Sequence, residues 1–461
     1  MSGLVRRDVV RIAPTSLMVD SPPAAPAGTA GAPLPAAFAV VAGLTAAEIV
    51  RQGAFYPADA FVVAVISAGL IVRSWTGIDG RARWVALAVT ACTGWWFLSA
   101  VVHGRAQAFL PLGASMTAFL AAFLVVRRLD AGQRLGAAQA LATIGAGAAV
   151  IGLAASVMRW FPLAMPAQNL WRLSTSLTYS DAAGMLLGMA LLTGIALDQH
   201  RWLTRVDVSL CMAGLVATQS RGAVLGVLVG ACVVPMAAAR RALRSILAGL
   251  VGGLVVVGTS SGPAHHPLAG VVVGAVIVAA GGIRRPRHGR RITRRQVRVT
   301  IVATVVAVAF ATAALHTPIQ RRVELASTSD RITEWHAAFD QWRSSPWIGV
   351  GPDRLLTFHA VDGTYAFFAH NEYLQVLAGA GVVGELLLLV AVGTVAVAVR
   401  REDTLSSCGV AALAVFAVAG ALDFDWHLAV LGLMGGWVCG LAGRTPCPPS
   451  TEKGSDHLYG G

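Results

Sequence analysis

Long apolar segments recur along almost the whole of this 461-residue chain, and they constrain its fold more than any other feature. A bilayer core of roughly 30 Å requires about 20 apolar residues per helical span, and none of the segments shows the alternating pattern of a membrane β-barrel. With 56% hydrophobic and only 13% charged residues, the chain also has too little polar surface for a soluble protein of this length. We therefore predict an all-α, polytopic bundle of transmembrane helices.

The apolar segments divide the chain into regions. Fourteen of them could form transmembrane helices, and because several are short or rich in glycine we expect 12 to 14 spans. We predict a disordered cytoplasmic N-terminal tail, a helix bundle, a long extracytoplasmic loop with an amphipathic helix, C-terminal transmembrane helices and a cytoplasmic tail. These five regions cover residues 1–34, 35–315, 316–374, 375–443 and 444–461. The expected spans lie near residues 35–50, 55–72, 84–102, 107–126, 135–157, 181–197, 206–220, 222–239, 245–261, 265–283, 299–315, 375–399, 406–421 and 427–443.

The basic residues predict how the bundle lies in its membrane. Residues 284–298 contain eight arginines, which places this loop in the cytoplasm. Alternation from that loop puts 26 of the 36 Lys and Arg residues on the cytoplasmic side, so we expect both termini there and the protein in the cytoplasmic (inner) membrane. Because short loops account for most of the net charge of +13, nucleic acid is not an expected partner. Six cysteines lie in or beside apolar runs without a Cys-x-x-Cys pair, so neither a disulfide framework nor a zinc site is expected.

Polar residues interrupt the apolar pattern most strongly between residues 330 and 385, and we expect the chemistry of the protein there. An amphipathic helix is predicted over residues 331–343, since its apolar residues are three and four positions apart. A plainer interpretation is a helix that lies on the membrane surface with Arg331 paired to Glu334. The apolar positions of this helix are Ile332, Trp335, Phe339 and Trp342.

Three arginines are expected on the extracytoplasmic side, against the general charge bias. Arg221 interrupts two apolar runs, Arg331 begins the amphipathic helix, and Arg172 lies in the segment before the sixth span. An arginine at the membrane edge must extend to water, pair with an acid or meet an anionic ligand. Because all three arginines are expected on the same side of the membrane, they favour a common anionic ligand. For Arg221, extension of the side chain to water is the simpler alternative.

His370 ends the long loop, and we expect it in the first turn of the helix that follows. The positive end of a helix disfavours imidazolium, which predicts a lowered pKa and a neutral ring that can accept a proton near pH 7. A structural hydrogen bond is the more common role for a single histidine at such a place. The neighbouring Asn371 and Glu372 are expected to orient the ring or to bind ligand hydroxyl groups.

Five short motifs follow one another between residues 220 and 384. They are Ser220-Arg-Gly222, Arg331 with Trp335, Ser345-Pro-Trp-Ile-Gly-Val-Gly351, His370-Asn-Glu-Tyr-Leu-Gln375 and Gly379-Ala-Gly381-Val-Val-Gly384. In order and spacing they resemble the motifs of the O-antigen ligase and O-antigen polymerase family. Residues 172–184 also resemble the family's segment before a span, but the Asn usual near Tyr179-Ser-Asp181 is absent, which leaves the role of Asp181 open.

The resemblance implies a glycosyltransferase of the GT-C type. Such an enzyme takes a glycan from a polyprenyl diphosphate, usually undecaprenyl diphosphate, and transfers it to an acceptor hydroxyl outside the cytoplasmic membrane, with no metal or other cofactor. Arg221 and Arg331 would stabilise the departing diphosphate, and His370 would accept the proton of the attacking hydroxyl, with inversion at the anomeric carbon. The residues expected to bind substrate are Arg172, Asn371, Glu372 and Tyr373.

Several alternatives stay open at this point. The motifs do not separate a polymerase from a ligase, and the acceptor is a glycan, a lipid or a protein. A transporter or flippase of lipid-linked oligosaccharides would also need basic residues, but it should carry charge at mid-membrane depth between broken helices. Asp423 and Asp425 resemble the acidic pair with which other membrane glycosyltransferases hold a metal ion, although two acids in a turn are more often solvated or cap a helix.

Overall fold

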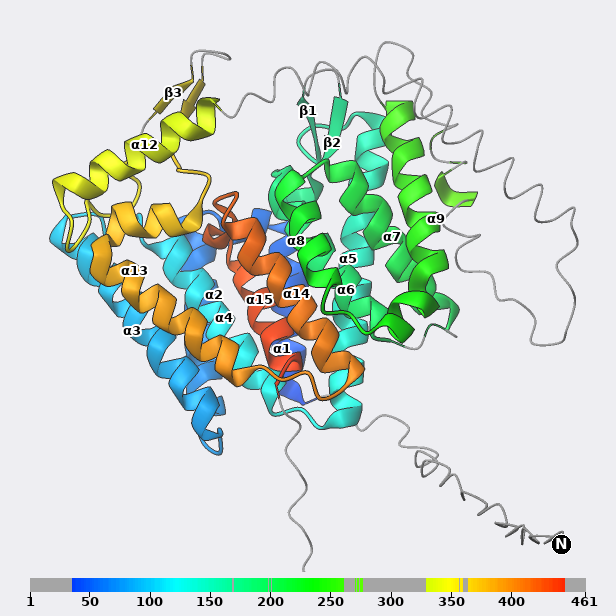
Figure 1. Ribbon diagram of the computed structural model, residues 1–461, viewed down its shortest axis with the longest axis horizontal. Coiled ribbons are helices and arrows are strands. Elements are labelled where there is room, and N and C mark those ends of the chain that lie inside the picture. The colour runs from blue at the N-terminus through cyan, green and yellow to red at the C-terminus, as the bar shows by residue number, and fades with distance from the viewer. Residues whose placement is uncertain are drawn as a thin grey trace, which may run out of the picture.

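The computed structural model describes residues 35–167, 170–197, 199, 201–260, 270, 272, 274–276, 329–355, 357–359 and 364–443. Most of these residues are in helices that lie side by side as a bundle (Figure 1). The helices are α1 (Ala36–Val50), α2 (Pro57–Ser74), α3 (Gly80–Val102), α4 (Leu110–Arg127), α5 (Ala131–Met158), α6 (Ser180–Ile195), α7 (Trp202–Thr218), α8 (Arg221–Ala231), α9 (Met236–Ser260), α12 (Ser329–Ser344), α13 (Glu372–Ala398), α14 (Thr404–Gly420) and α15 (Ala429–Leu441).

The helices have the length and composition of membrane spans. Among the described residues, α2, α3, α4, α5, α9 and α13 are long and apolar enough to cross a membrane, and several shorter apolar helices pack beside them. This agrees with the predicted helical membrane bundle. The number of spans stays a prediction, because residues 299–315 and most of 265–283 lie outside the described residues.

The helix expected over residues 222–239 is much shorter than predicted. α8 ends at Ala231, and at 1.5 Å per residue its 11 residues reach about 16 Å, roughly half of a bilayer core. Pro235 then precedes α9, whose alanine-rich start favours a helix. Residues 240–244, which separate two of the predicted spans, therefore lie inside α9.

Two helices form the centre of the bundle. Every residue of α15 is buried, as is every residue of α6 except Asp181. α15 packs along α4 through three glycines spaced by four residues, where an added Cβ would meet α4 atoms at each position. Small residues at this spacing let two membrane helices approach closely. The three are Gly432, Gly436 and Gly440.

α13 is bent sharply at Gly381, where the backbone has a φ of 68°. Its first part lies across the end of the bundle below α12, and its second part descends beside α3 (Figure 1). Loop 345–351 fills the bend, and Val350 donates its N–H to the carbonyl of Ala378 at 3.0 Å. The two glycine-containing motifs are therefore packed against each other within this chain.

The long loop before α13 holds structure that the all-α prediction missed. The strands β3 (Thr357–His359) and β4 (Thr364–Ala366) pair as a hairpin, and β1 (Ala164–Ala167) and β2 (Leu170–Leu173) form another before α6. Strands of three or four residues are too short to give a periodic pattern.

The amphipathic helix is present as α12, but its apolar residues do not all face inward. Glu334 and Ala338 are buried, whereas Ile332 and Phe339 are exposed. Ala338 packs in a small apolar cluster with Leu355, Ala369 and Ala378, so the inward face is set by the narrow space between α12 and α13. The carboxylate of Glu334 consequently points into the protein.

Candidate active site

Four elements that are distant in the sequence meet at the end of the bundle that carries α12. They are α12 itself, the start of α13, the turn between α14 and α15, and the segment from β2 to the start of α6. Ion pairs and hydrogen bonds connect their polar side chains across element boundaries. We call this group of residues the polar cluster; it contains Arg172, Tyr179, Asp181, Arg331, Glu334, His370 and Asp423.

His370 and Glu334 form the central pair of the polar cluster. The Nδ1–H of His370 donates to Oε2 of Glu334 at 2.8 Å, and this direction follows because an ionised carboxylate can only accept. The Glu334 side chain is 1% exposed and that of His370 is 22% exposed. With Nδ1 occupied, Nε2 of His370 carries the lone pair that can accept a proton.

His370 lies two residues before α13, not in its first turn as expected. Asn371 is the N-cap and accepts a hydrogen bond from the N–H of Leu374 at 3.1 Å. His370 itself has a positive φ of 45°, which is uncommon for a residue other than glycine. Such a conformation persists only where the surrounding structure holds it, as at many functional sites.

The expectation that the pKa of His370 is lowered is wrong. Burial does disfavour the imidazolium form, but the hydrogen bond to Glu334 and the negative charges of Asp423 and Glu334 favour it more strongly, so the pKa is raised above its usual value. Arg331 opposes this effect only in part. The sequence pattern did not place the Glu334 carboxylate of α12 beside His370. This carboxylate favours imidazolium more strongly than the start of α13 disfavours it.

Arg331 contacts the turn between α14 and α15 through two groups. Its Nη1 donates to the carbonyl oxygen of Leu422, and its Nη2 lies 3.7 Å from Oδ2 of Asp423. The side chain of Arg331 remains 43% exposed, which leaves part of the guanidinium accessible. The alternative in which Arg331 pairs with Glu334 does not describe this site, because Glu334 binds His370 instead.

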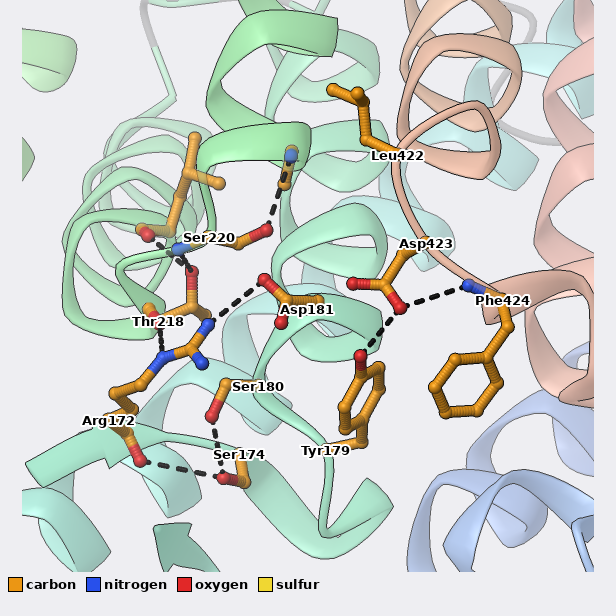
Figure 2. A network of polar contacts seen from close by, with 12 residues as sticks. Arg172, Ser174, Tyr179, Ser180, Asp181, Thr218, Ser220, Leu422, Asp423 and Phe424 are labelled. Atoms are coloured by element: carbon orange, nitrogen blue, oxygen red, sulfur yellow. Dashed lines mark hydrogen bonds and ion pairs between the residues drawn. The ribbon is translucent and has the colours of Figure 1, made fainter. Parts of the chain in front are cut away.

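Asp423 is buried between Arg331 and Tyr179. The Tyr179 hydroxyl donates to Oδ1 of Asp423 at 2.6 Å, and the N–H of Phe424 donates to the same oxygen at 2.9 Å (Figure 2). Burial, together with the charge of Asp181, raises the pKa of Asp423, while His370, Arg331 and the Tyr179 hydroxyl act in the opposite direction. Asp423 thus joins residues from three parts of the chain.

Arg172 occupies the other side of the polar cluster. Its Nη2 donates to Oδ1 of Asp181 at 2.9 Å, and its Nε donates to the carbonyl of Thr218 at 2.9 Å, as Figure 2 shows. Asp181, whose role the sequence left open, is therefore the partner of Arg172. Arg172 links β2 to the end of α7, immediately before the turn that leads to Arg221.

Arg221 is the first residue of α8 and is exposed. The Ser220 side chain caps α8 by accepting from the N–H of Ala223 at 3.2 Å. An added Cβ on Gly222 would lie 3.3 Å from Cβ of Leu422, so the start of α8 packs beside the residue whose carbonyl binds Arg331. The start of α8 and the side chain of Arg331 therefore meet the same turn between α14 and α15.

Residues 264–390 match the model of the O-antigen ligase family. This range contains both members of the central pair, His370 and Glu334, as well as Arg331 and the two glycine-containing motifs. We call this matched range the O-antigen ligase domain. The match confirms the family resemblance of the motifs, and it agrees with a helical membrane protein. No curated protein matches the chain significantly.

Part of the polar cluster comes from outside the O-antigen ligase domain. Arg172, Tyr179 and Asp181 of the cluster precede the domain in the sequence, as does Arg221 beside it, and Asp423 follows the domain. The fold brings these residues to the domain through the contacts of Asp423 with Arg331 and the packing of α8 on Leu422. The O-antigen ligase domain alone does not contain the whole polar cluster.

The three residues after His370 contact protein groups. Asn371 caps α13, and the Tyr373 hydroxyl lies 3.4 Å from the carbonyl of Ala417. Glu372 is fully buried and accepts hydrogen bonds from the turn between α14 and α15. These contacts suit residues that shape the site, and direct binding of a ligand by any of the three stays a prediction.

The acidic residues Asp423 and Asp425 have different surroundings. Asp423 faces Arg331 and Tyr179, whereas the carboxylate oxygens of Asp425 are buried and have no hydrogen-bond partner among the described residues. Burial and the charges of Asp423, Asp181 and Glu372 raise the pKa of Asp425 well above its usual value. Within the described ranges, no group of three or more His, Cys, Asp or Glu side chains is arranged to hold a metal ion.

The sequence did not reveal the functional partners of the predicted residues. From the sequence, Glu334 is expected only as a neighbour of Arg331, and Asp423 only as part of an acidic pair that could hold a metal ion. Glu334 follows Arg331 by three residues, which places both side chains on one side of α12. This spacing is the signal by which the sequence could assign Glu334 to the site. No local pattern connects Arg331 to Asp423, which follows it by 92 positions.

Proposed function

We propose that this membrane protein is a glycosyltransferase that moves a glycan from a polyprenyl diphosphate to an acceptor hydroxyl at the outer face of the cytoplasmic membrane. The observation that carries the proposal is the 2.8 Å bond from His370 to the buried Glu334, inside the O-antigen ligase domain and beside the accessible Arg331. The chain would adopt a GT-C architecture with both termini in the cytoplasm, as the charge distribution predicts.

His370 is the proposed general base. Nε2 takes the proton of the acceptor hydroxyl as its oxygen attacks the anomeric carbon, and Glu334 stabilises the imidazolium that forms. The bond between the anomeric carbon and the diphosphate oxygen breaks, and its electron pair leaves with the diphosphate. One direct displacement of this kind inverts the anomeric centre. The partly exposed ring can then release its proton to water.

Arg331 and Arg221 are the proposed partners of the leaving group. Guanidinium groups bind phosphate oxygens through paired donors, and fixed positive charge stabilises the diphosphate as it departs. Asp423 and the Leu422 carbonyl hold Arg331 on one side while its remaining donors stay accessible. Arg172 is already paired with Asp181, so its proposed part in substrate binding is weaker.

The test uses purified protein in liposomes with a radiolabelled undecaprenyl-diphosphate oligosaccharide and a glycan or lipid acceptor. We expect transfer by the wild type, with or without EDTA, and a loss of at least about 10²-fold for His370→Ala. His336→Ala, which changes an exposed histidine of α12, is the matched control and should retain full activity. Transfer undiminished in His370→Ala would contradict the assigned base.

The same experiment separates the alternative functions. A ladder of products indicates a polymerase, whereas a single addition indicates a ligase. A flippase would move the labelled lipid across the bilayer without transfer. α13 is broken at Gly381, as expected of such a transporter, but loop 345–351 fills the break, and the nearby Glu385 has the wrong charge to bind a diphosphate.

A further inference from the structure

A second histidine–carboxylate pair lies behind the polar cluster. Oε1 of Glu372, at the start of α13, accepts the N–H of Trp426 at 2.6 Å and the Nδ1–H of His427 at 3.2 Å. The Glu372 side chain is 0% exposed, and that of His427 is also buried. Both donors belong to the short 3-10 turn Asp425–His427, which joins α14 to α15. We call this pair the clamp.

The clamp connects the two elements on which the proposed reaction depends. His370 precedes Glu372 by two residues, so the clamp fixes the part of the chain that carries the base. Leu422 and Asp423, which hold Arg331, are separated from the clamped turn by Phe424 alone. The pair therefore joins the position of the base to the position of the guanidinium group.

An aromatic wall separates the clamp from the polar cluster. The ring of Phe368 stacks on that of Phe424, with 4.3 Å between the ring centroids. The centroid of the Phe368 ring also lies 5.1 Å from that of His427. Phe424 meets His370 edge to face at 5.3 Å. Because protein interiors are close-packed, a shift of the His427 ring would displace Phe368 and Phe424 and, through them, His370.

Burial strengthens the clamp and makes it dependent on both partners. Burial disfavours the charged form of His427, but Glu372, by charge and by hydrogen bond, raises the pKa of the ring, and Asp353 adds to this effect from the loop after α12. Removing one member of a buried pair leaves the other without compensation. Without Glu372, the turn would lose two hydrogen bonds to the start of α13.

We propose that Glu372 and His427 are positioning residues that hold Arg331 in register with His370. The proposal rests on the proposed glycosyl transfer, and it gives Glu372 a role other than direct contact with a sugar. Displacement of a reacting group by about 1 Å can lower a rate by about 10²-fold. Neither side chain touches the substrate, since both are buried behind Phe368 and Phe424.

The decisive test compares two replacements of His427. The amide nitrogen of Asn can occupy the place of Nδ1, whereas that of Gln reaches the place of Nε2. We expect His427→Asn to keep kcat within about 5-fold of the wild type and His427→Gln to lower kcat about 10²-fold, with the KM for the lipid donor changed less than about 3-fold in both. Equal kcat values for the two variants would overturn the proposal.

The partner residue provides an independent comparison. Glu372→Gln keeps an oxygen that can accept from Trp426, and it should retain more activity than Glu372→Ala by about 10-fold. A result in which Glu372→Ala keeps wild-type kcat would refute a positioning role for the clamp. Each variant is compared at a concentration of folded protein measured by gel filtration in detergent.

A control variant accounts for general destabilisation. Asp207 is a buried carboxylate of α7 that accepts from Gln139 at 2.8 Å and from Thr143 at 3.0 Å, about 16 Å along the helix from Thr218. Asp207→Ala should lower thermal stability but leave kcat of the folded fraction unchanged.

If the wild type shows no transfer at all, the proposed function fails; if transfer requires His370 but not the clamp, only this inference fails.

Discussion

At the scale of residues, the chemistry of the site depends on which carboxylate each basic side chain meets. Glu334 binds His370, Asp423 binds Arg331, and Asp181 binds Arg172. Among these three basic side chains, that of Arg331 is the most exposed. An exposed guanidinium group is what binding of an anionic substrate group requires.

The pH dependence of transfer tests the role of Glu334. The active form of the base is neutral His370, whose pKa is raised, so activity should rise with pH as the ring loses its proton. Glu334→Gln removes the charge that favours imidazolium and should move this rise to lower pH by about one unit, while kcat falls about 10-fold or more. The measurement is the pH profile of kcat. An unchanged profile would show that Glu334 does not control the ring.

At the scale of elements, the bend in α13 decides where His370 lies. A straight helix would continue the span upward, whereas the bend lays the first part of α13 below α12 (Figure 1). Carbonyls freed by the bend are bound by α3, since Ser99 donates to Gly379 at 2.8 Å and Trp95 donates to Ala380 at 2.9 Å. Satisfying these groups matters because an unpaired buried carbonyl costs about 1–3 kcal/mol.

Gly381→Ala tests the importance of this bend. Gly381 combines a φ of 68° with a ψ of −174°, a region restricted to glycine, and an added Cβ would collide with the backbone of Trp347. We expect a loss of at least about 2 kcal/mol in stability and loss of transfer. Thermal unfolding in detergent and the liposome assay measure the two effects.

Gly393→Ala in the same helix is the matched control. Nothing lies within 4 Å of a Cβ added at Gly393, so this change should leave transfer intact and raise helix stability by about 0.5–1 kcal/mol. Similar behaviour of the two variants would argue against a special role for the bend.

At the scale of the whole molecule, the bundle brings one polar site together from both sides of the O-antigen ligase domain. The central helices α6 and α15 each lead from the site into the buried core, and the turns before them carry Tyr179 and Asp423. The opposite end of the bundle carries the ion pair of Arg127 with Asp79 at 2.7 Å, in which Arg127 is buried and Asp79 is exposed.

Membrane orientation is testable with single cysteines. In a background with Cys232→Ser and Cys447→Ser, Ser344→Cys at the end of α12 should react with a membrane-impermeant maleimide added outside intact cells, because the site is expected at the outer face. Ala131→Cys, exposed at the start of α5, should react only after permeabilisation. The reverse pattern would invert the proposed topology.

The sequence by itself determined the helical membrane character, most helix positions and the identity of His370, Arg331 and Arg221 as candidates. Apolar length and charge bias act locally along the chain, so they can be read without a fold. The motifs also sufficed for the family, because their order and spacing are linear properties.

Only the tertiary structure decided which groups meet. Glu334 and His370 are 36 positions apart, and the clamp joins Glu372 to a residue 55 positions away. No periodicity encodes such pairs, because they arise from the bend in α13 and from the packing of α12 against it. The direction of the His370 pKa shift followed from that packing, since a carboxylate at hydrogen-bond distance outweighs the partial charge at a helix end.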